Sequence, residues 1–259
     1  MNVVFASSRG LSLEHVAPKN ILVSATPGGK LKQLKEAAEL IIPPPCGLVK
    51  RRRRRKHIYF LCGITDLTHL EKSYSHRYKE CVFTGDPHKA ADDYCQNLTK
   101  CQNDILNRGA LPIFCTVPNM NIAIYNNFML SQGKTSHLKH QNQYSKMQED
   151  LETAINSINS QIHQINKKIH VSTPFLHETI RKRMGRKNRR YNVYMWDKFY
   201  DGLHPPRDPL KPMPLLQEWM GIIQNAVQLN ENLEDSEEEA SEEESSFWRH
   251  STSKRPRVE

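Results

Sequence analysis

The chain has 259 residues, of which 37% are hydrophobic, and it carries a formal net charge of +9. No stretch approaches the ~18 apolar residues of a membrane helix, and the apolar start at residues 3–6 is too short for a secretion signal and has no basic residues before it. We therefore expect an intracellular protein that is neither membrane-spanning nor secreted. The length favours one sizeable domain with polar tails.

The charge is spread unevenly along the chain. Residues 231–259 hold ten acidic and four basic residues, a net charge of −6, so the remaining 230 residues carry about +15. A body this basic attracts phosphate polymers or acidic surfaces. Solubility alone is the alternative explanation.

Cysteine usage argues against a disulfide framework. The six cysteines show no C-x-x-C pairing, which favours free thiols in a reducing compartment. Histidine and cysteine are frequent between Cys62 and Cys101, but their spacings match no standard zinc pattern. We therefore expect no metal site and no cofactor.

Buried strands and helices alternate along the chain. Apolar runs predict strands at residues 3–6, 20–25, 57–64 and 111–117, with a fifth, shorter strand or extended segment at 170–175. Helical patterns lie near 30–42, 91–108, 143–169 and 215–229, and segments 67–90 and 118–142 look irregular. This order predicts an α/β fold, a three-layer α/β/α structure around a flavodoxin-like parallel sheet of about five strands.

The predicted helix at 143–169 carries an apolar stripe. Its isoleucines and Leu151 recur at alternating spacings of three and four residues. A coiled coil with a partner would show the same stripe, but charges at the flanking positions are sparse. Packing against the sheet is the favoured interpretation.

Two basic clusters interrupt the body. Residues 50–56 are seven consecutive cations, and a second cluster at 181–190 precedes several aromatic residues. Each cluster is either a solvated loop or a surface that contacts nucleic acid. The aromatic residues at 191–200 either belong to such a nucleic-acid surface or pack beneath the loop at Asp201. The candidate nucleic-acid ligands are Arg51, Arg52, Arg53, Arg54, Arg55, Arg183, Arg186, Lys187, Arg189 and Arg190.

The last segment, 230–259, is acidic and rich in Ser and Glu. It has almost no hydrophobic residues, so we expect it to be disordered. It ends in a basic cluster at 254–257 which, like the insertion at 50–56, resembles a nuclear-import signal. The predicted organisation is therefore a domain at 1–229 with a basic insertion at 50–56, followed by this tail, with a nuclear address.

Asp201-Gly202-Leu203-His204, followed by two prolines, is the most informative motif. An acid and a histidine three positions apart in a turn can face the same way, so that the carboxylate orients the imidazole. A nucleophile–base–acid triad would need a Ser or Cys from another element. Ser8, just after the first strand, is placed at the sheet edge where ligands bind in open α/β folds, although a serine at this position is also a common helix cap.

Four short blocks, in order, resemble those of SGNH (GDSL-type) hydrolases. They are Ala6-Ser7-Ser8-Arg9, Pro27-Gly28-Gly29-Lys30-Leu31, Gly63-Ile64-Thr65-Asp66 and Asp201-Gly202-Leu203-His204-Pro205. The resemblance spans residues 1–225. The layout is also similar to SGNH-like domains associated with mobile elements in invertebrate genomes.

The resemblance implies roles for individual residues. Ser8 would be the nucleophile, His204 its base and Asp201 the residue that orients His204. The N–H groups of Ser8 and Gly28, together with Thr65, would form the oxyanion hole. Thr65 stands where the family has Asn, and Ala6-Ser7 stand where the family has Gly-Asp before the nucleophile.

These residues support two alternative functions, and a third interpretation assigns the protein neither of them. The first is a serine esterase or deacetylase acting on a small acyl ester. The alternative is a catalytically degenerate SGNH-like module that binds nucleic acid or a nuclear partner through its basic loops. In the third, the fold has no activity and the basic runs serve only nuclear import.

Overall fold

The computed structural model describes residues 2–42, 55–72, 79–134, 138–185, 191–206 and 212–251, with side chains up to residue 236 in the last range. The cluster residues Arg51 to Arg54, and the predicted ligands between 186 and 190, lie outside the described residues. Within the described residues, no helix is both long enough and apolar enough to cross a membrane.

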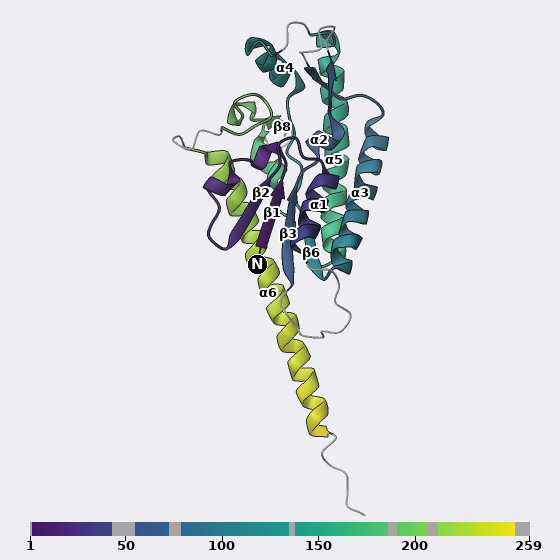
Figure 1. The fold of residues 1–259 in the computed structure, drawn as a ribbon, viewed down its shortest axis with the longest axis vertical. Helices are drawn as coiled ribbons and strands as arrows, with labels where there is room; N and C mark the ends of the chain where they lie inside the picture. Colours follow the sequence, from purple (N-terminus) through teal and green to yellow (C-terminus); the bar gives the residue numbers. More distant parts are fainter. Residues whose placement is uncertain are drawn as a thin grey trace, which may run out of the picture.

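Four parallel strands form the central sheet. They are β1 (Asn2–Ala6), β2 (Ile21–Ala25), β3 (Lys56–Leu61) and β6 (Ala110–Phe114), in the order β2-β1-β3-β6 (Figure 1). The register is regular, with Val4 beside Val23 on one side and Tyr59 on the other. Four of the predicted strands and their parallel arrangement are confirmed, and all four strands end at the same edge of the sheet.

Successive side chains of the central strands pack into two separate hydrophobic cores, one on each face of the sheet. Val3, Phe5 and Phe60 face the helices α1 (Leu31–Ile41), α3 (Pro87–Asn107) and α5 (Tyr144–Lys168). Val4 and Tyr59 face the other layer, where helix α6 (Pro214–Ser251) buries Trp219 completely. Because successive side chains of a strand point to opposite faces, strands buried on both sides produce the predicted three-layer α/β/α structure.

The predicted fifth strand is not present in the described sheet. Residues 171–175 run irregularly between α5 and the short 3-10 helix η4 (Leu176–Ile180). Two contacts hold them in place: Ser172 N–H donates to the side chain of Asn230 at 2.6 Å, and the carbonyl of Pro174 accepts from Thr116 N–H at 3.0 Å. Pro174 also has no N–H to give to a strand ladder.

Segments that looked irregular contain regular elements. In the 67–90 segment, β4 (His69–Lys72) pairs antiparallel with β5 (Lys79–Val82), and α4 (Ile122–Ser131) lies in the 118–142 segment. A second hairpin pairs β7 (Arg181–Met184) with β8 (Tyr191–Tyr194). A four-residue α2 (Ile64–Leu67) and 3-10 helices η1 (Ser8–Gly10), η2 (Leu13–His15), η3 (Gln141–Gln143) and η5 (Trp196–Lys198) complete the described elements.

Helix α6 continues well past the expected boundary at residues 229–230. Just after that boundary, Asn230 donates to the hydroxyl oxygen of Tyr59 at 3.2 Å, and Glu231 accepts from Asn2 at 3.0 Å. Glu234 lies 3.4 Å from the buried ring of His57. The start of the acidic tail is therefore helical and attached to the sheet, and the helix extends away from the body as far as Ser251 (Figure 1).

Candidate active site

Ser8 lies at the carboxyl edge of the sheet, directly after β1. The N–H of Ser7 donates to the carbonyl of Leu61 at 2.9 Å, which extends the β1–β3 pairing by one residue. The chain then turns sharply through η1, and Gly10 N–H donates to the carbonyl of Ser7 at 2.9 Å. A Cβ on Gly10 would lie 2.2 Å from the Cβ of Ala6, so only glycine lets the turn fold this closely over the strand end.

Asp201 and His204 form a local unit. The Asp201 Oδ1 atom accepts from the N–H groups of Leu203 and His204, at 2.9 and 2.6 Å, while Oδ2 lies 2.6 Å from His204 Nδ1. Gly202 has a φ of 78°, and its carbonyl accepts from Asn121 N–H at 2.9 Å. The turn therefore aims the carboxylate at its own histidine, as the motif predicted.

The structure brings Ser8 and His204 together from 196 positions apart. The Ser8 Oγ atom lies 3.2 Å from His204 Nε2. When Nδ1 donates to Asp201, Nε2 of the neutral ring is an acceptor and receives the hydrogen of the serine hydroxyl. The three side chains thus form one continuous hydrogen-bonded chain with the geometry that a nucleophile, base and acid require.

Hydrogen bonding stabilises the ionised form of Asp201. Its side chain is only 2% exposed, and burial by itself would raise its pKa. The hydrogen bonds and charge of His204, with the N–H of Leu203, outweigh burial and hold the pKa below its ordinary value. An acid that stays ionised can stabilise a positive charge on the neighbouring imidazole.

The loop at Gly28 is attached to the segment after β3. Gly28 has a φ of 65° and lies in the turn closed by Gly29 N–H, which donates to the carbonyl of Thr26 at 2.9 Å. The hydroxyl of Thr65 donates to the carbonyl of Gly29 at 2.7 Å. The geometry therefore gives Thr65 a role in holding the loop, and its hydroxyl hydrogen is engaged there rather than presented as the predicted oxyanion donor.

Asp66 anchors the same loop from the other side. Both of its carboxylate oxygens accept from the N–H of Leu31, at 3.1 and 3.2 Å, where α1 begins. Burial raises the pKa of Asp66 to about 6, although that hydrogen bond and the charge of Lys30 lower it in part. The N–H at the start of α1 therefore offsets only part of the cost of burying this carboxylate.

Sequence reasoning missed Arg9, which is 4% exposed and lies directly after the nucleophile candidate. Its guanidinium donates to the carbonyls of Pro118 and Asn119, the latter at 3.0 Å, and it lies 5.7 Å from the ring centre of Phe199. Burial lowers the pKa of Arg9 to about 9, and the charge of Asp201 opposes that shift. The sequence offered no signal for this role, because arginine is mostly exposed and only the fold shows that Arg9 is buried.

The aromatic residues at 191–200 divide between packed and exposed positions. Phe199 is buried in the core, and Tyr194 stacks on Trp196 with ring centres 4.8 Å apart. Tyr191 and Tyr200 are 61% and 47% exposed. Packing thus accounts for three of these five side chains and leaves two at the surface.

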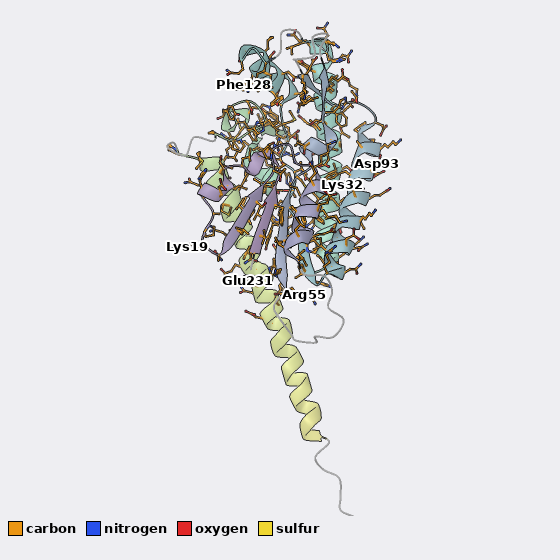
Figure 2. All side chains as sticks on the ribbon, in the orientation of Figure 1. Lys19, Lys32, Arg55, Asp93, Phe128 and Glu231 are labelled. Carbon is orange, nitrogen blue, oxygen red and sulfur yellow. The ribbon has the colours of Figure 1, made fainter. Side chains whose placement is uncertain are left out.

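Two of the predicted nucleic-acid ligands, Arg55 and Arg183, lie within the described residues. Arg55 precedes β3 at the opposite edge of the sheet, and Figure 2 shows it at the lower end of the body, with Phe128 at the top. Arg183 is exposed on β7. The described structure therefore adds neither residue to the Ser8 site.

A cysteine nucleophile has no support among the described residues. Their five cysteines are free and buried, and burial raises the pKa of each thiol, for example that of Cys81 to about 11. Within the same described part of the chain, no three His, Cys, Asp or Glu side chains are grouped to hold a metal ion.

Comparison with known proteins identifies the fold. The sequence matches no protein-family model and no curated protein. A solved structure described as an acylhydrolase from Bacteroides fragilis superposes with a TM-score of 0.50 at 10% identity, over 89% of this chain and 86% of that one. A GDSL-like lipase from Bacteroides thetaiotaomicron gives the same TM-score and identity over 88% of each chain. The chain has the fold of an SGNH hydrolase-like domain. Identity this low establishes the SGNH-like fold alone.

Proposed function

We propose that this SGNH-like domain is a serine hydrolase that cleaves a small acyl ester through Ser8, His204 and Asp201. The observation that carries the proposal is the unbroken hydrogen-bonded chain from Ser8 Oγ through both ring nitrogens of His204 to Asp201. The SGNH hydrolase-like fold supports hydrolase activity in general.

Each residue has a defined step in acyl transfer. Ser8 Oγ attacks the ester carbonyl while His204 Nε2 takes the hydroxyl proton and Asp201 stabilises the imidazolium. The N–H groups of Ser8 and Gly28 are the proposed donors to the oxyanion. His204 then gives its proton to the leaving alcohol as the C–O bond breaks, and water, activated in the same way, releases the acid from Ser8.

Active-site labelling tests the proposal. We expect a fluorophosphonate to label the purified protein, and expect Ser8→Ala to abolish labelling and hydrolysis of phenyl acetate. His204→Ala should slow hydrolysis by roughly 10⁶-fold and Asp201→Asn by roughly 10⁴-fold, the scale of losses in Ser-His-Asp sites. Ser7→Ala, which changes the neighbouring buried serine, is the matched control and should label at the wild-type rate. A folded wild-type protein that neither labels nor hydrolyses the ester would refute the proposal.

A second candidate function, nucleic-acid binding, is favoured by the β7–β8 hairpin. This arm exposes Lys182 and Arg183 together with Tyr191, and exposed cations beside aromatic rings suit a single-stranded backbone and its bases. The nuclear location expected from clusters 50–56 and 254–257 would bring the domain to such a partner.

Salt dependence tests this second candidate. Binding to a labelled 20-nucleotide DNA or RNA should weaken steeply between ~50 and ~200 mM salt, because phosphate contacts release counterions. Replacing Arg51–Arg55 with Ala, or Lys182 and Arg183 with Ala, should reduce both the affinity and its salt dependence. Lys32→Ala is the control, because that side chain is 87% exposed on α1. An affinity that is insensitive to salt would refute the candidate.

A further inference from the structure

Aromatic side chains gather at the His204 imidazole. The ring of Tyr200 lies nearly parallel to the imidazole, with centres 6.1 Å apart and planes at 27°. The ring of Tyr125 lies 6.2 Å away at 54°, and Phe128 packs edge-on against Tyr200 at 5.4 Å. Tyr200 is nevertheless 47% exposed, so this aromatic group, which we call the ring wall, reaches the surface beside the base.

The ring wall is held by rigid backbone. Tyr125 and Phe128 come from α4, whose first turn is capped by the Asn121 side chain accepting from Ile124 N–H at 2.9 Å. In the same helix, the Asn126 amide makes two 2.8 Å hydrogen bonds to the backbone of Cys81. A surface fixed in this way binds a partner without ordering new side chains.

The wall is also fixed relative to the catalytic turn. Tyr200 N–H donates to the carbonyl of His204 at 3.1 Å. Asn121 N–H donates to the carbonyl of Gly202, which connects α4 to the same turn. The backbone that carries these rings is therefore fixed relative to the turn that carries His204.

The chemistry of the proposed hydrolysis places one part of the substrate beside this wall. In the acylation step His204 Nε2 gives its proton to the leaving alcohol oxygen as the C–O bond breaks, so this oxygen must lie within hydrogen-bond distance of Nε2. The acyl oxygen instead points to the proposed donors at Ser8 and Gly28. The alcohol part of the ester is therefore the part that emerges next to Tyr200 and Tyr125.

We infer that the alcohol part of the substrate carries a six-membered ring, which packs on the exposed part of Tyr200. A flat ring face matches an aromatic face in area and geometry, whereas a flexible alkyl chain gains less from it and loses more rotational freedom. Sugar rings and aryl rings share this flat face. The inference rests on the proposed hydrolase function and assigns the side of the substrate that determines specificity.

Matched acetate esters of primary alcohols test the inference. Benzyl acetate and methyl 6-O-acetyl-glucopyranoside carry aryl and sugar rings, and n-heptyl acetate carries a chain of about the size of the benzyl group. We expect the ring esters to have the higher kcat/KM, and expect Tyr200→Leu to lower the ratio of ring-ester to heptyl-ester kcat/KM by up to about tenfold. Phe175→Leu, at an exposed aromatic residue elsewhere, is the control and should leave that ratio unchanged.

The outcomes separate this inference from the proposed function. A ratio that Tyr200→Leu leaves at its wild-type value, in a protein that still labels at Ser8, overturns the ring inference and retains the hydrolase. A protein that hydrolyses none of the esters and does not label overturns both. If only the sugar ester or only the benzyl ester responds to Tyr200→Leu, the inference stands and the ring is identified as that type.

Discussion

Gly202 is the residue at which a single methyl group should disturb the site most directly. Its φ of 78° lies in the region that side chains rarely adopt, and an added Cβ would lie 2.8 Å from the Cβ of Ile124 and 3.1 Å from the carbonyl oxygen of Asn121. Gly109 provides a matched control, because its φ is 79° and an added Cβ would meet nothing within 4 Å. The two Gly→Ala variants therefore share the backbone strain and differ in the overlap.

The magnitudes follow from these two contributions. Positive φ costs an alanine roughly 1–2 kcal/mol, which should be the whole effect at Gly109. Overlap in a packed site adds about 1–3 kcal/mol at Gly202. For a chain of this size the difference between the variants corresponds to roughly 2–12 °C in Tm. Relief of the overlap should also displace the turn that carries Asp201 and His204, and a shift of about 1 Å costs on the order of 100-fold in rate.

Thermal unfolding and the rate of fluorophosphonate labelling measure the two effects. We expect Gly202→Ala to unfold at a lower temperature than Gly109→Ala and to label much more slowly, while Gly109→Ala labels at the wild-type rate. Equal Tm values would show that the Ile124 side chain moves away from the added Cβ without lowering the free energy of unfolding. Equal labelling rates would show that the turn geometry does not control Ser8, and either result would refute the corresponding step of the reasoning.

Three further changes test individual contacts. Thr65→Asn should raise kcat by up to roughly 100-fold, because it adds a carboxamide donor to the oxyanion hole. The lost hydrogen bond to Gly29 should lower the free energy of unfolding by about 1 kcal/mol. An unchanged kcat would contradict the expected gain. Asp66 has a raised pKa of about 6, so its contribution to stability is full below the unfolded pKa and is lost as pH rises through 6. Asp66→Asn should therefore flatten the pH dependence of the free energy of unfolding between about pH 4 and pH 6, and an unaltered slope in urea titrations would exclude Asp66 as its source. Arg9→Met removes the guanidinium donors to two buried carbonyls and should cost about 1–3 kcal/mol in urea unfolding, whereas the exposed Arg183→Met should cost almost nothing.

The sequence predicted the parts of the site that depend on strand ends and local spacing. Ser8 and Gly28 follow two neighbouring parallel strands, and parallel strands end at one edge, so their proximity follows from the fold class. Asp201 and His204 are three positions apart, so a single local turn is enough to bring their side chains together. The meeting of Ser8 with His204 was predictable only through the resemblance, because nothing in the residues themselves connects positions 196 apart.

Other features escaped prediction for physical reasons. The hairpins and α4 are short, and short elements depend on tertiary contacts such as the bonds of Asn126 to Cys81 rather than on periodicity. The acidic start of the tail has no apolar stripe, yet glutamate is a good helix former, and α6 continues through it because Glu231 and Glu234 reach the sheet. The oxyanion role of Thr65 was predicted from its position in the block at residues 63–66. The direction of its hydroxyl hydrogen depends instead on the nearby carbonyl of Gly29.

Arg9 explains how distant segments converge on one catalytic geometry. Its guanidinium joins the turn after β1 to the backbone after β6 and packs on Phe199, two residues before Asp201. A buried cation requires all of these partners at once, because each missing acceptor would leave a desolvated charge. The backbone of the nucleophile, the loop before α4 and the base-bearing turn are therefore fixed by one side chain. Labelling of Ser8 should consequently be lost in the same cooperative transition as the packing of the second core, where Phe199 and Trp219 are buried, and labelling that persists after that core unfolds would show that the triad assembles independently of Arg9.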